Sequence, residues 1–170
     1  MKKAIVLTLF AVCTSIMAMA QKDGKTKFSA GPEIGIATGT FGLSWGLGIG
    51  VSAQAEHFFQ ENVSGTALLG LISYFGKSYA PGKKYTAYTT IPLRVGVRYY
   101  IGDGFHAGLQ IGVGFLSYGG SSTTAFAYSP QLGYNFKTNK NKAIDLTLKY
   151  DAYTKNGTIG AIDLRVAYVF

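Results

Sequence analysis

The last ten residues, AIDLRVAYVF (161–170), alternate between large apolar side chains and, up to Ala167, small or charged ones. The large apolar residues occupy every second position: Ile162, Leu164, Val166, Tyr168 and Phe170. Asp163 and Arg165 fall between them. Because the side chains of a strand point alternately to two faces, this spacing predicts a strand with one apolar and one polar face.

The same alternation recurs along the chain, with turn residues between the segments. We expect eight strands, near residues 28–38, 41–56, 63–75, 91–100, 105–115, 123–136, 144–151 and 161–170. The 23 glycines and the many β-branched and aromatic residues disfavour helices. The pattern therefore predicts an all-β domain with meander topology and no second domain.

The first twenty residues have a different character. Two lysines are followed by a short apolar stretch that ends at Ala18-Met19-Ala20, the pattern of a cleavable secretory signal. We expect cleavage after Ala20, a short segment over 21–27 and the barrel domain over 28–170. Cys13, the only cysteine, lacks the sequence around it that lipidation needs, and its loss with the signal excludes disulfides and thiolate sites from the mature chain.

Composition narrows the class of this exported chain. Charged residues make up 14% of the sequence, yet after Ala20 no apolar run is long enough for a transmembrane helix. A closed β-barrel is the other structure that can span a bilayer, because it leaves no backbone group unpaired. The mature chain has fourteen Lys and Arg against eight Asp and Glu, a net charge of +6. Its lysines gather at strand ends, which favours contact with anionic lipid headgroups over nucleic-acid binding.

The two faces of the strands can be assigned by size. The interior of an eight-stranded barrel is only just wide enough to be filled by side chains, so the track rich in Phe, Tyr, Leu and Ile is expected to face lipid. Aromatic pairs such as Tyr74 and Phe75, or Tyr99 and Tyr100, are then expected in the girdles at the membrane interfaces. The polar track would line the lumen, and it carries nine charges that we expect to pair across it: Glu33, Glu56, Arg94, Arg98, Asp145, Lys149, Asp151, Asp163 and Arg165.

With its signal peptide, eight alternating segments and aromatic C-terminal strand, the chain resembles the small outer-membrane β-barrel family of OmpX and the OmpA transmembrane domain. The resemblance covers residues 28–170. It implies an eight-stranded antiparallel up-and-down transmembrane barrel in the bacterial outer membrane. It also implies that the barrel-insertion machinery reads the apolar track from Ile162 to Phe170 as an assembly signal, above all at Tyr168 and Phe170.

An even number of strands with both termini in the periplasm puts residues 38–41, 76–87, 117–123 and 152–158 outside the cell. The segment 76–87 interleaves aromatics with Lys77, Lys83 and Lys84, which makes it a candidate contact for lipopolysaccharide phosphates. Short loops weaken an adhesive role implied by the resemblance. We expect a monomer with lipid and lipopolysaccharide as its partners.

Three functions stay open at this point. The first is a structural or surface-interaction role with a salt-bridged, mostly closed lumen; the second is a small porin-like channel. The third is a lipid-modifying barrel enzyme, but His57 and His106 have no evident nucleophile beside them in the sequence. No cluster has metal-ligand spacing, so we expect no catalytic residues, metal or cofactor.

Overall fold

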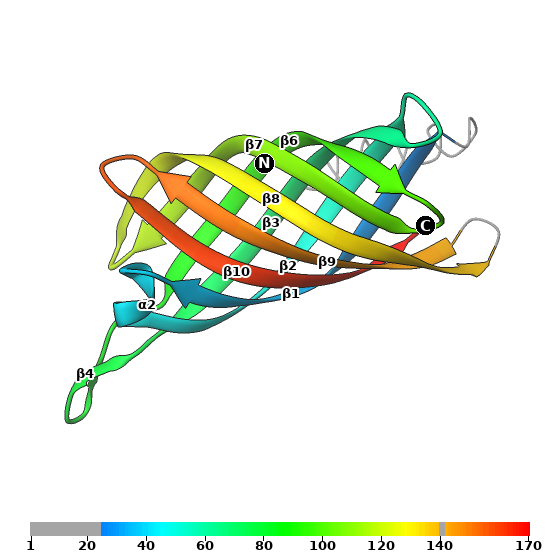
Figure 1. Ribbon diagram of the computed structural model, residues 1–170. Helices are drawn as coiled ribbons and strands as arrows, with labels where there is room; N and C mark the ends of the chain where they lie inside the picture. Colours follow the sequence, from blue (N-terminus) through cyan, green and yellow to red (C-terminus); the bar gives the residue numbers. More distant parts are fainter. Residues whose placement is uncertain (1–24, 140–141) are drawn as a thin grey trace, which may run out of the picture.

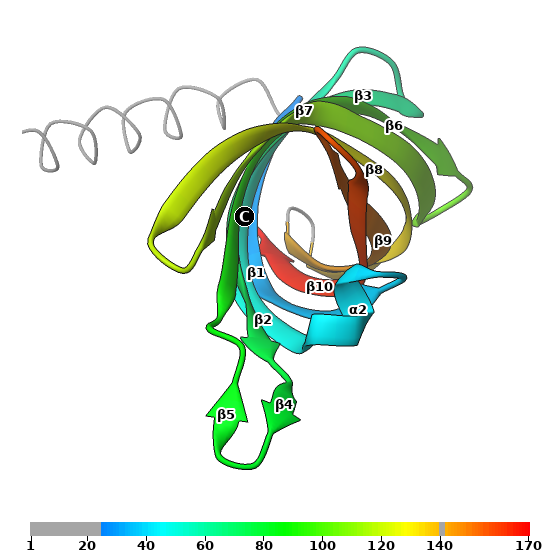
Figure 2. The same cartoon turned by 90° about the vertical axis from the view of Figure 1, so that its left-hand side faces the viewer.

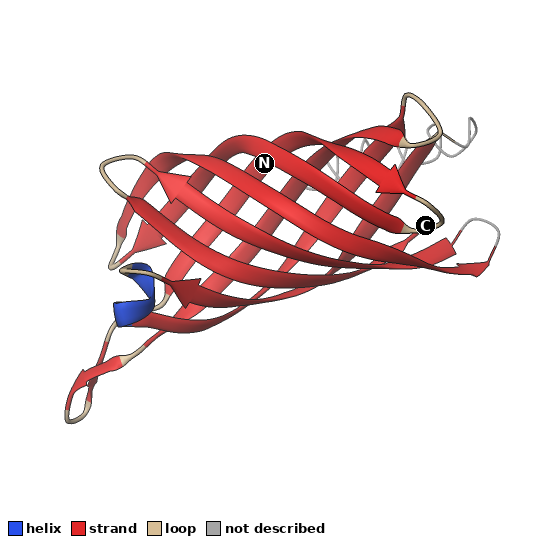
Figure 3. Ribbon diagram, in the orientation of Figure 1, coloured by secondary structure: helices blue, strands red, loops and turns tan. Residues whose placement is uncertain are grey.

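The computed structural model of the protein describes residues 25–139 and 142–170. Eight long strands close into one antiparallel barrel (Figure 1). These are β1 (Thr26–Thr38), β2 (Trp45–Phe58), β3 (Val63–Gly76), β6 (Tyr88–Ile101), β7 (Phe105–Tyr118), β8 (Ser121–Asn139), β9 (Lys142–Thr154) and β10 (Thr158–Val169). A short helix, α2 (Phe41–Ser44), precedes β2, and a small hairpin of β4 (Ser78–Ala80) and β5 (Lys83–Lys84) joins β3 to β6 (Figure 3). The predicted fold class is confirmed.

Each strand of the barrel pairs with its neighbours in the chain, and the first strand pairs with the last. In this closing seam Glu33 of β1 lies opposite Arg165 of β10, and the Phe170 amide donates a hydrogen bond of 2.9 Å to the Phe28 carbonyl. Closure leaves the barrel sheet without an open edge, which a sheet in lipid requires. Among the described residues, no helix is long and apolar enough to cross a membrane.

The two ends of the barrel differ. The terminal rim carries the start of β1, Phe170 and the turns over 59–62 and 102–104. The loop rim carries α2, the β4–β5 hairpin and the connections over 119–120 and 155–157 (Figure 1). The expected loops over 117–123 and 152–158 are wrong in extent, because the strands run further than the sequence suggested. Gly119 and Gly120, both with positive φ, make a two-residue turn, and Ser117 and Ser122 share a 2.9 Å hydrogen bond across it.

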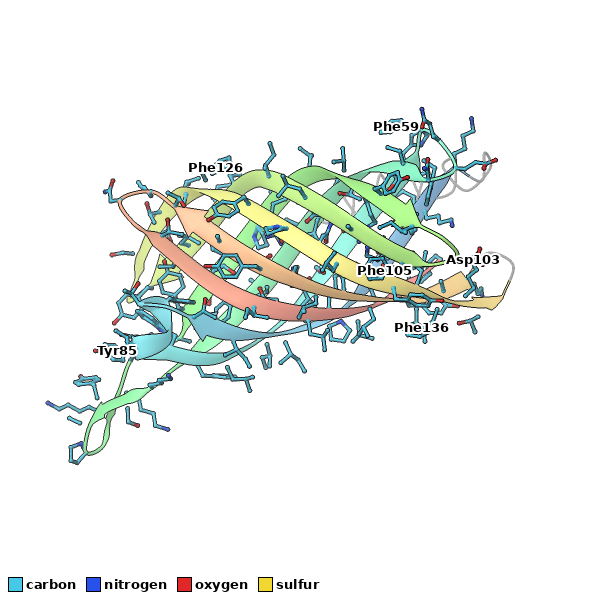
Figure 4. The ribbon with its side chains drawn as sticks, in the orientation of Figure 1. Phe59, Tyr85, Asp103, Phe105, Phe126 and Phe136 are labelled. Carbon is cyan, nitrogen blue, oxygen red and sulfur yellow. The ribbon has the colours of Figure 1, made fainter. Side chains whose placement is uncertain are left out.

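The outer wall is apolar over its whole circumference. Ile34 of β1, Val95 of β6 and Leu164 of β10 are between 40% and 60% exposed, whereas the alternate residues of the same strands are buried. Figure 4 shows Phe105, Phe126 and Phe136 projecting from the wall. The apolar track therefore faces outward and the polar track inward, as the size argument predicted.

Two expectations about aromatic and apolar residues are wrong. The strand expected from residue 41 begins at Trp45, because residues 41–44 form α2 and turn Phe41 into the barrel mouth, where it is 3% exposed. Tyr74 is fully buried in the lumen, and Tyr100 also points inward, where it contacts Glu56. Neighbouring residues of a strand face opposite sides, so only one of each adjacent aromatic pair reaches the girdle.

Candidate functional site

The lumen is the most distinctive site of this barrel, because the nine charged side chains of the polar track meet there. Each is at most 7% exposed. They come from five strands: Glu33 on β1, Glu56 on β2, Arg94 and Arg98 on β6, Asp145, Lys149 and Asp151 on β9, and Asp163 and Arg165 on β10. The period of two explains why all nine share one face of the sheet.

Near the terminal rim, Arg98 joins two walls of the barrel. Its Nη1 lies 3.3 Å from Glu56 Oε2 on β2 and 3.0 Å from Asp145 Oδ2 on β9. Tyr100 donates a 2.8 Å hydrogen bond to Glu56, and His106 Nε2 lies 3.0 Å from Asp145 Oδ2. The guanidinium thus spans the lumen between carboxylates that Tyr100 and His106 also contact.

The middle of the lumen holds a second group of ion pairs. Arg94 Nη1 lies 2.7 Å from Asp151 Oδ1, across the barrel from β6 to β9. Lys149 Nζ lies 2.9 Å from Glu33 Oε2 and 3.3 Å from Asp151 Oδ2. Arg165 connects this group to the first, with contacts of 3.7 Å to Glu33 and 3.5 Å to Asp145. Eight of the nine predicted charges therefore form one connected network.

Asp163 is the exception among the nine. Tyr74 donates a 2.9 Å hydrogen bond to its Oδ1, and no ion pair within the described part of the chain involves it. Its carboxylate lies against Gly35 of β1, where an added Cβ would come within 1.7 Å of Oδ1. A glycine at this position makes room for the Asp163 side chain. The ion pair predicted for Asp163 does not occur, because Tyr74 is its partner instead.

Beyond Asp163, toward the loop rim, the lumen becomes aromatic. We call the cluster of Phe41, Trp45, Tyr74, Tyr88 and Tyr118 the aromatic plug. The ring centroid of Phe41 lies 5.1–5.2 Å from those of Trp45, Tyr74 and Tyr88, and Trp45 packs edge-on against Tyr118 at 5.1 Å. The expected polar lumen is thus wrong for this half of the barrel, where Ile72 and Leu116 also point inward.

Sequence reasoning missed the contacts of several other polar residues of the lumen. His106 was considered only as a catalytic residue, and the hydrogen bonds of Gln110 to Gln54 at 3.0 Å and to Thr66 at 3.1 Å were not foreseen. The alternation already placed these residues on the polar track. The alternation does not report the stagger between strands, and this stagger decides which residues meet across the lumen.

The two histidines do not form a catalytic arrangement. His57 lies on the exterior at the terminal rim, where its Nδ1 is 2.8 Å from Thr26 Oγ1. His106 is fully buried and contacts a carboxylate that Arg98 also binds. No group of three His, Cys, Asp or Glu side chains in residues 25–139 and 142–170 is placed to hold a metal ion.

The three lysines of the loop segment have different surroundings. Lys77 donates a hydrogen bond to the Gly42 carbonyl and so joins the base of the hairpin to α2. Lys83 and Lys84 form β5 and are exposed. Tyr79 and Tyr85 pack together at 4.9 Å, and Figure 4 shows Tyr85 at the base of the hairpin. All three lysines are exposed, but Lys77 is held against α2, whereas Lys83 and Lys84 project with the hairpin.

The C-terminal strand presents its five apolar side chains outward. Ile162, Leu164, Val166, Tyr168 and Phe170 are all between 40% and 47% exposed. Tyr168 and Phe170 pack edge-on, with ring centroids 5.1 Å apart, beside the closing seam. This places both aromatics at the terminal rim, on the lipid-facing surface.

A family model described as the outer membrane protein beta-barrel domain matches residues 6–170, nearly the whole chain. The chain belongs to this family. It is therefore a protein of the bacterial outer membrane. A comparison with curated proteins finds no match.

Solved structures of other small barrels share the fold of this outer-membrane barrel at low sequence identity. OprG from Pseudomonas aeruginosa is 8% identical with a TM-score of 0.59, over 85% of this chain and 93% of that one. Ail, the attachment invasion locus protein of Yersinia pestis, is 14% identical with a TM-score of 0.54, over 85% and 97%. Neisserial surface protein A is 14% identical with a TM-score of 0.52, over 85% and 94%. At these identities the likeness shows the fold alone.

Proposed function

We propose that this outer-membrane barrel has a closed lumen and acts as a structural or surface-interaction protein, not as a channel. The observation that carries the proposal is that two different obstructions lie in series along the lumen. The ion-pair network around Arg94 and Arg98 bridges opposite walls, and the rings of the aromatic plug pack together in the mouth at the loop rim.

The charges support closure for an energetic reason. Carboxylates and guanidinium groups that are removed from water are costly unless each finds a partner. Here the network supplies partners at 2.7–3.7 Å for eight of the nine charges. A continuous water column would remove the need for such pairing, so the dense contacts favour a lumen that side chains occupy.

We further propose that the terminal rim faces the periplasm and that the signal is cleaved after Ala20. The loop rim would then face outward, with the β4–β5 hairpin as its most prominent feature (Figure 2). Lys83 and Lys84 would meet the phosphates of lipopolysaccharide, and the apolar C-terminal strand would meet the barrel-insertion machinery. In this proposal the protein is a monomer and has no enzymatic activity.

Conductance in planar bilayers tests the closed lumen against the porin-like alternative. Refolded wild-type protein should give no steady conductance. Arg94→Ala should leave Asp151 without its closest cation and lower the free energy of unfolding by about 3 kcal/mol. It should also admit water and produce intermittent current. Lys83→Ala is the matched control, since it removes one positive charge from the exposed hairpin and should change neither quantity.

Two results would count against the proposal. Steady wild-type conductance at the level of a porin, unchanged by Arg94→Ala, would show that water fills the lumen. Equal stability of the Arg94→Ala and Lys83→Ala proteins would show that the Arg94–Asp151 contact is solvated. Modification of lipid A on overexpression would instead support the enzyme alternative.

A further inference from the structure

The outer wall has an open hollow on the side of β1, β2, β3 and β6. Its volume is about 730 Å³, and its lining is almost entirely apolar. The lining includes Ala30, Val51, Ala53, Leu69, Leu71 and Ile91. Ala30 and Ala53 lie opposite each other in the β1–β2 pair, and Leu69 is the next residue across. Two short side chains between longer ones therefore leave a depression in a surface that faces lipid.

Polar groups lie next to this hollow on the way to the loop rim. On β3 the next outward residue after Leu71 is Ser73, and on β6 the outward residue that precedes Ile91 is Thr89. The two are paired across these strands. Their hydroxyl oxygens are 3.2 Å apart and partly buried. Hydroxyls are unusual on a lipid-facing wall, where each polar group needs a partner. They form a polar pair within the wall, between Leu71 and the outward ring of Phe75, which is 49% exposed and closer to the loop rim.

Cations follow in the hairpin between these two strands. The hairpin that joins β3 to β6 contains Lys83 and Lys84, and the segment 77–87 has no acidic residue. Figures 1 and 2 show that the hairpin reaches beyond the rim and to the side of the barrel mouth. Its lysines thus lie on the membrane side of the mouth. From Leu71 to Gly76, where β3 ends, the strand path is roughly 17 Å at about 3.3 Å per residue, a length that suits an acyl chain.

We propose that this wall binds one lipid with a phosphorylated headgroup, the lipid A part of lipopolysaccharide. An acyl chain occupies the hollow beside Ala30 and Ala53, the hydroxyls of Ser73 and Thr89 meet its polar linkage, and Lys83 and Lys84 contact its phosphates. Apolar residues of the hollow, the hydroxyls on β3 and β6, and the cations of the hairpin between these strands thus follow one another toward the loop rim, with the Phe75 ring beside that path. Such a lipid carries its acyl chain, polar linkage and phosphates in the same sequence. This inference rests on the proposed outward orientation of the loop rim.

The opposite wall offers a matched control. A second apolar hollow of about 500 Å³ lies over β7, β8, β9 and β10 and is lined by Ala107, Leu132 and Leu148 among others. The two-residue turn at Gly119 and Gly120 and the short 155–157 connection lie above it, and Lys155, the one cation of these two connections, donates to Thr123. This hollow therefore lacks a cationic hairpin.

The test is native mass spectrometry of the folded full chain in micelles that contain a trace of lipid A. Ala53→Leu fills the proposed site, Ala30→Leu fills it from the neighbouring strand, and Ala107→Leu fills the control hollow. We expect the first two to lower lipid A retention roughly tenfold, since about two methylene groups lose their contacts. Ala107→Leu should retain lipid A as the wild type does. Lys83→Gln with Lys84→Gln should also lower retention roughly tenfold or more.

The outcomes separate the two proposals. Normal retention in Ala53→Leu and Ala30→Leu with loss in the double lysine variant would overturn the acyl site and leave the headgroup contact intact. Normal retention in all variants would overturn both. Equal retention of phosphatidylglycerol would overturn the assignment to lipid A. A protein dimer that Ala53→Leu abolishes would show that a second copy occupies the hollow. Heat-modifiable mobility of each variant on gels verifies that it is folded.

Discussion

At the scale of single residues, the glycines of the lumen decide where large side chains fit. Gly48 of β2 lies under the Tyr74 ring, and Gly114 of β7 lies under the Tyr153 ring. Tyr74 cannot move aside easily, since it is fully buried, bonded to Asp163 and packed against Phe41. Each of these glycines thus leaves the space that one aromatic ring occupies.

We predict that Gly48→Ala destabilises the barrel by about 1–3 kcal/mol, because its Cβ would lie 2.5 Å from Tyr74 Cδ1. Urea-induced unfolding in lipid vesicles measures the effect. Gly46→Ala is the control on the same strand and track, where the nearest atom to an added Cβ is Lys77 Cε at 3.4 Å. A similar loss in both variants would show that helix or strand propensity, and not the Tyr74 contact, sets the cost.

The residue scale also shows what sequence patterning can reach. Alternation placed Arg94, Asp151 and Asp163 on one face, and all three side chains lie in the lumen. It could not tell that Arg94 contacts Asp151 whereas Asp163 contacts Tyr74, because those partners depend on the stagger around the closed barrel. The adjacent aromatics carried an unused signal: a period of two already requires Tyr74 and Phe75 to face opposite sides.

At the scale of elements, the strands were predictable and the loop rim was not. Residues 41–44 continue the alternation of β2 in sequence, yet they form α2, and Phe41 enters the lumen. The preference is tertiary, because Phe41 gains contacts with Trp45, Tyr74 and Tyr88 that an outward position would not offer. A pattern that reports only local periodicity cannot register those contacts.

The last strand carries its own prediction. Deleting Phe170, or replacing it with serine, should reduce assembled barrel in the outer membrane more than deleting Pro81 and Gly82 at the hairpin tip. Phe170 bonds to Phe28 at the closing seam and exposes its ring beside Tyr168, whereas the tip makes no barrel contact that an assembly step would need. Quantifying the heat-modifiable form in membrane fractions tests this. Wild-type levels of the Phe170 deletion would contradict it.

At the scale of the whole molecule, the fold class and the family followed from composition and alternation together. The lack of a long apolar run after Ala20 argued against transmembrane helices, and the bulk of the apolar track argued for turning it outward. Only a closed sheet satisfies every strand edge in lipid. The interior was less predictable. Its division into an ion-pair half and an aromatic half arises where eight strands converge, and no single strand contains that information.

We predict that the mature protein begins at Gln21 and fractionates with the outer membrane. Its mobility on gels should change on heating, because the closed sheet resists detergent until it is heated. N-terminal sequencing and membrane fractionation measure these properties. Recovery of the protein in the soluble periplasm would contradict the membrane assignment.

The seam between β1 and β10 also determines when the barrel can close during folding. One edge of β1 has no partner until β10 has been synthesised. The barrel therefore cannot close while the chain is still being synthesised. The entropy of bringing the two ends of the chain together must be met before this seam forms, and folds dominated by such distant pairings fold slowly. Until then β1 offers an unpaired edge to any neighbouring chain. The cell must therefore shield an exported but still open chain for the whole interval between translocation and ring closure.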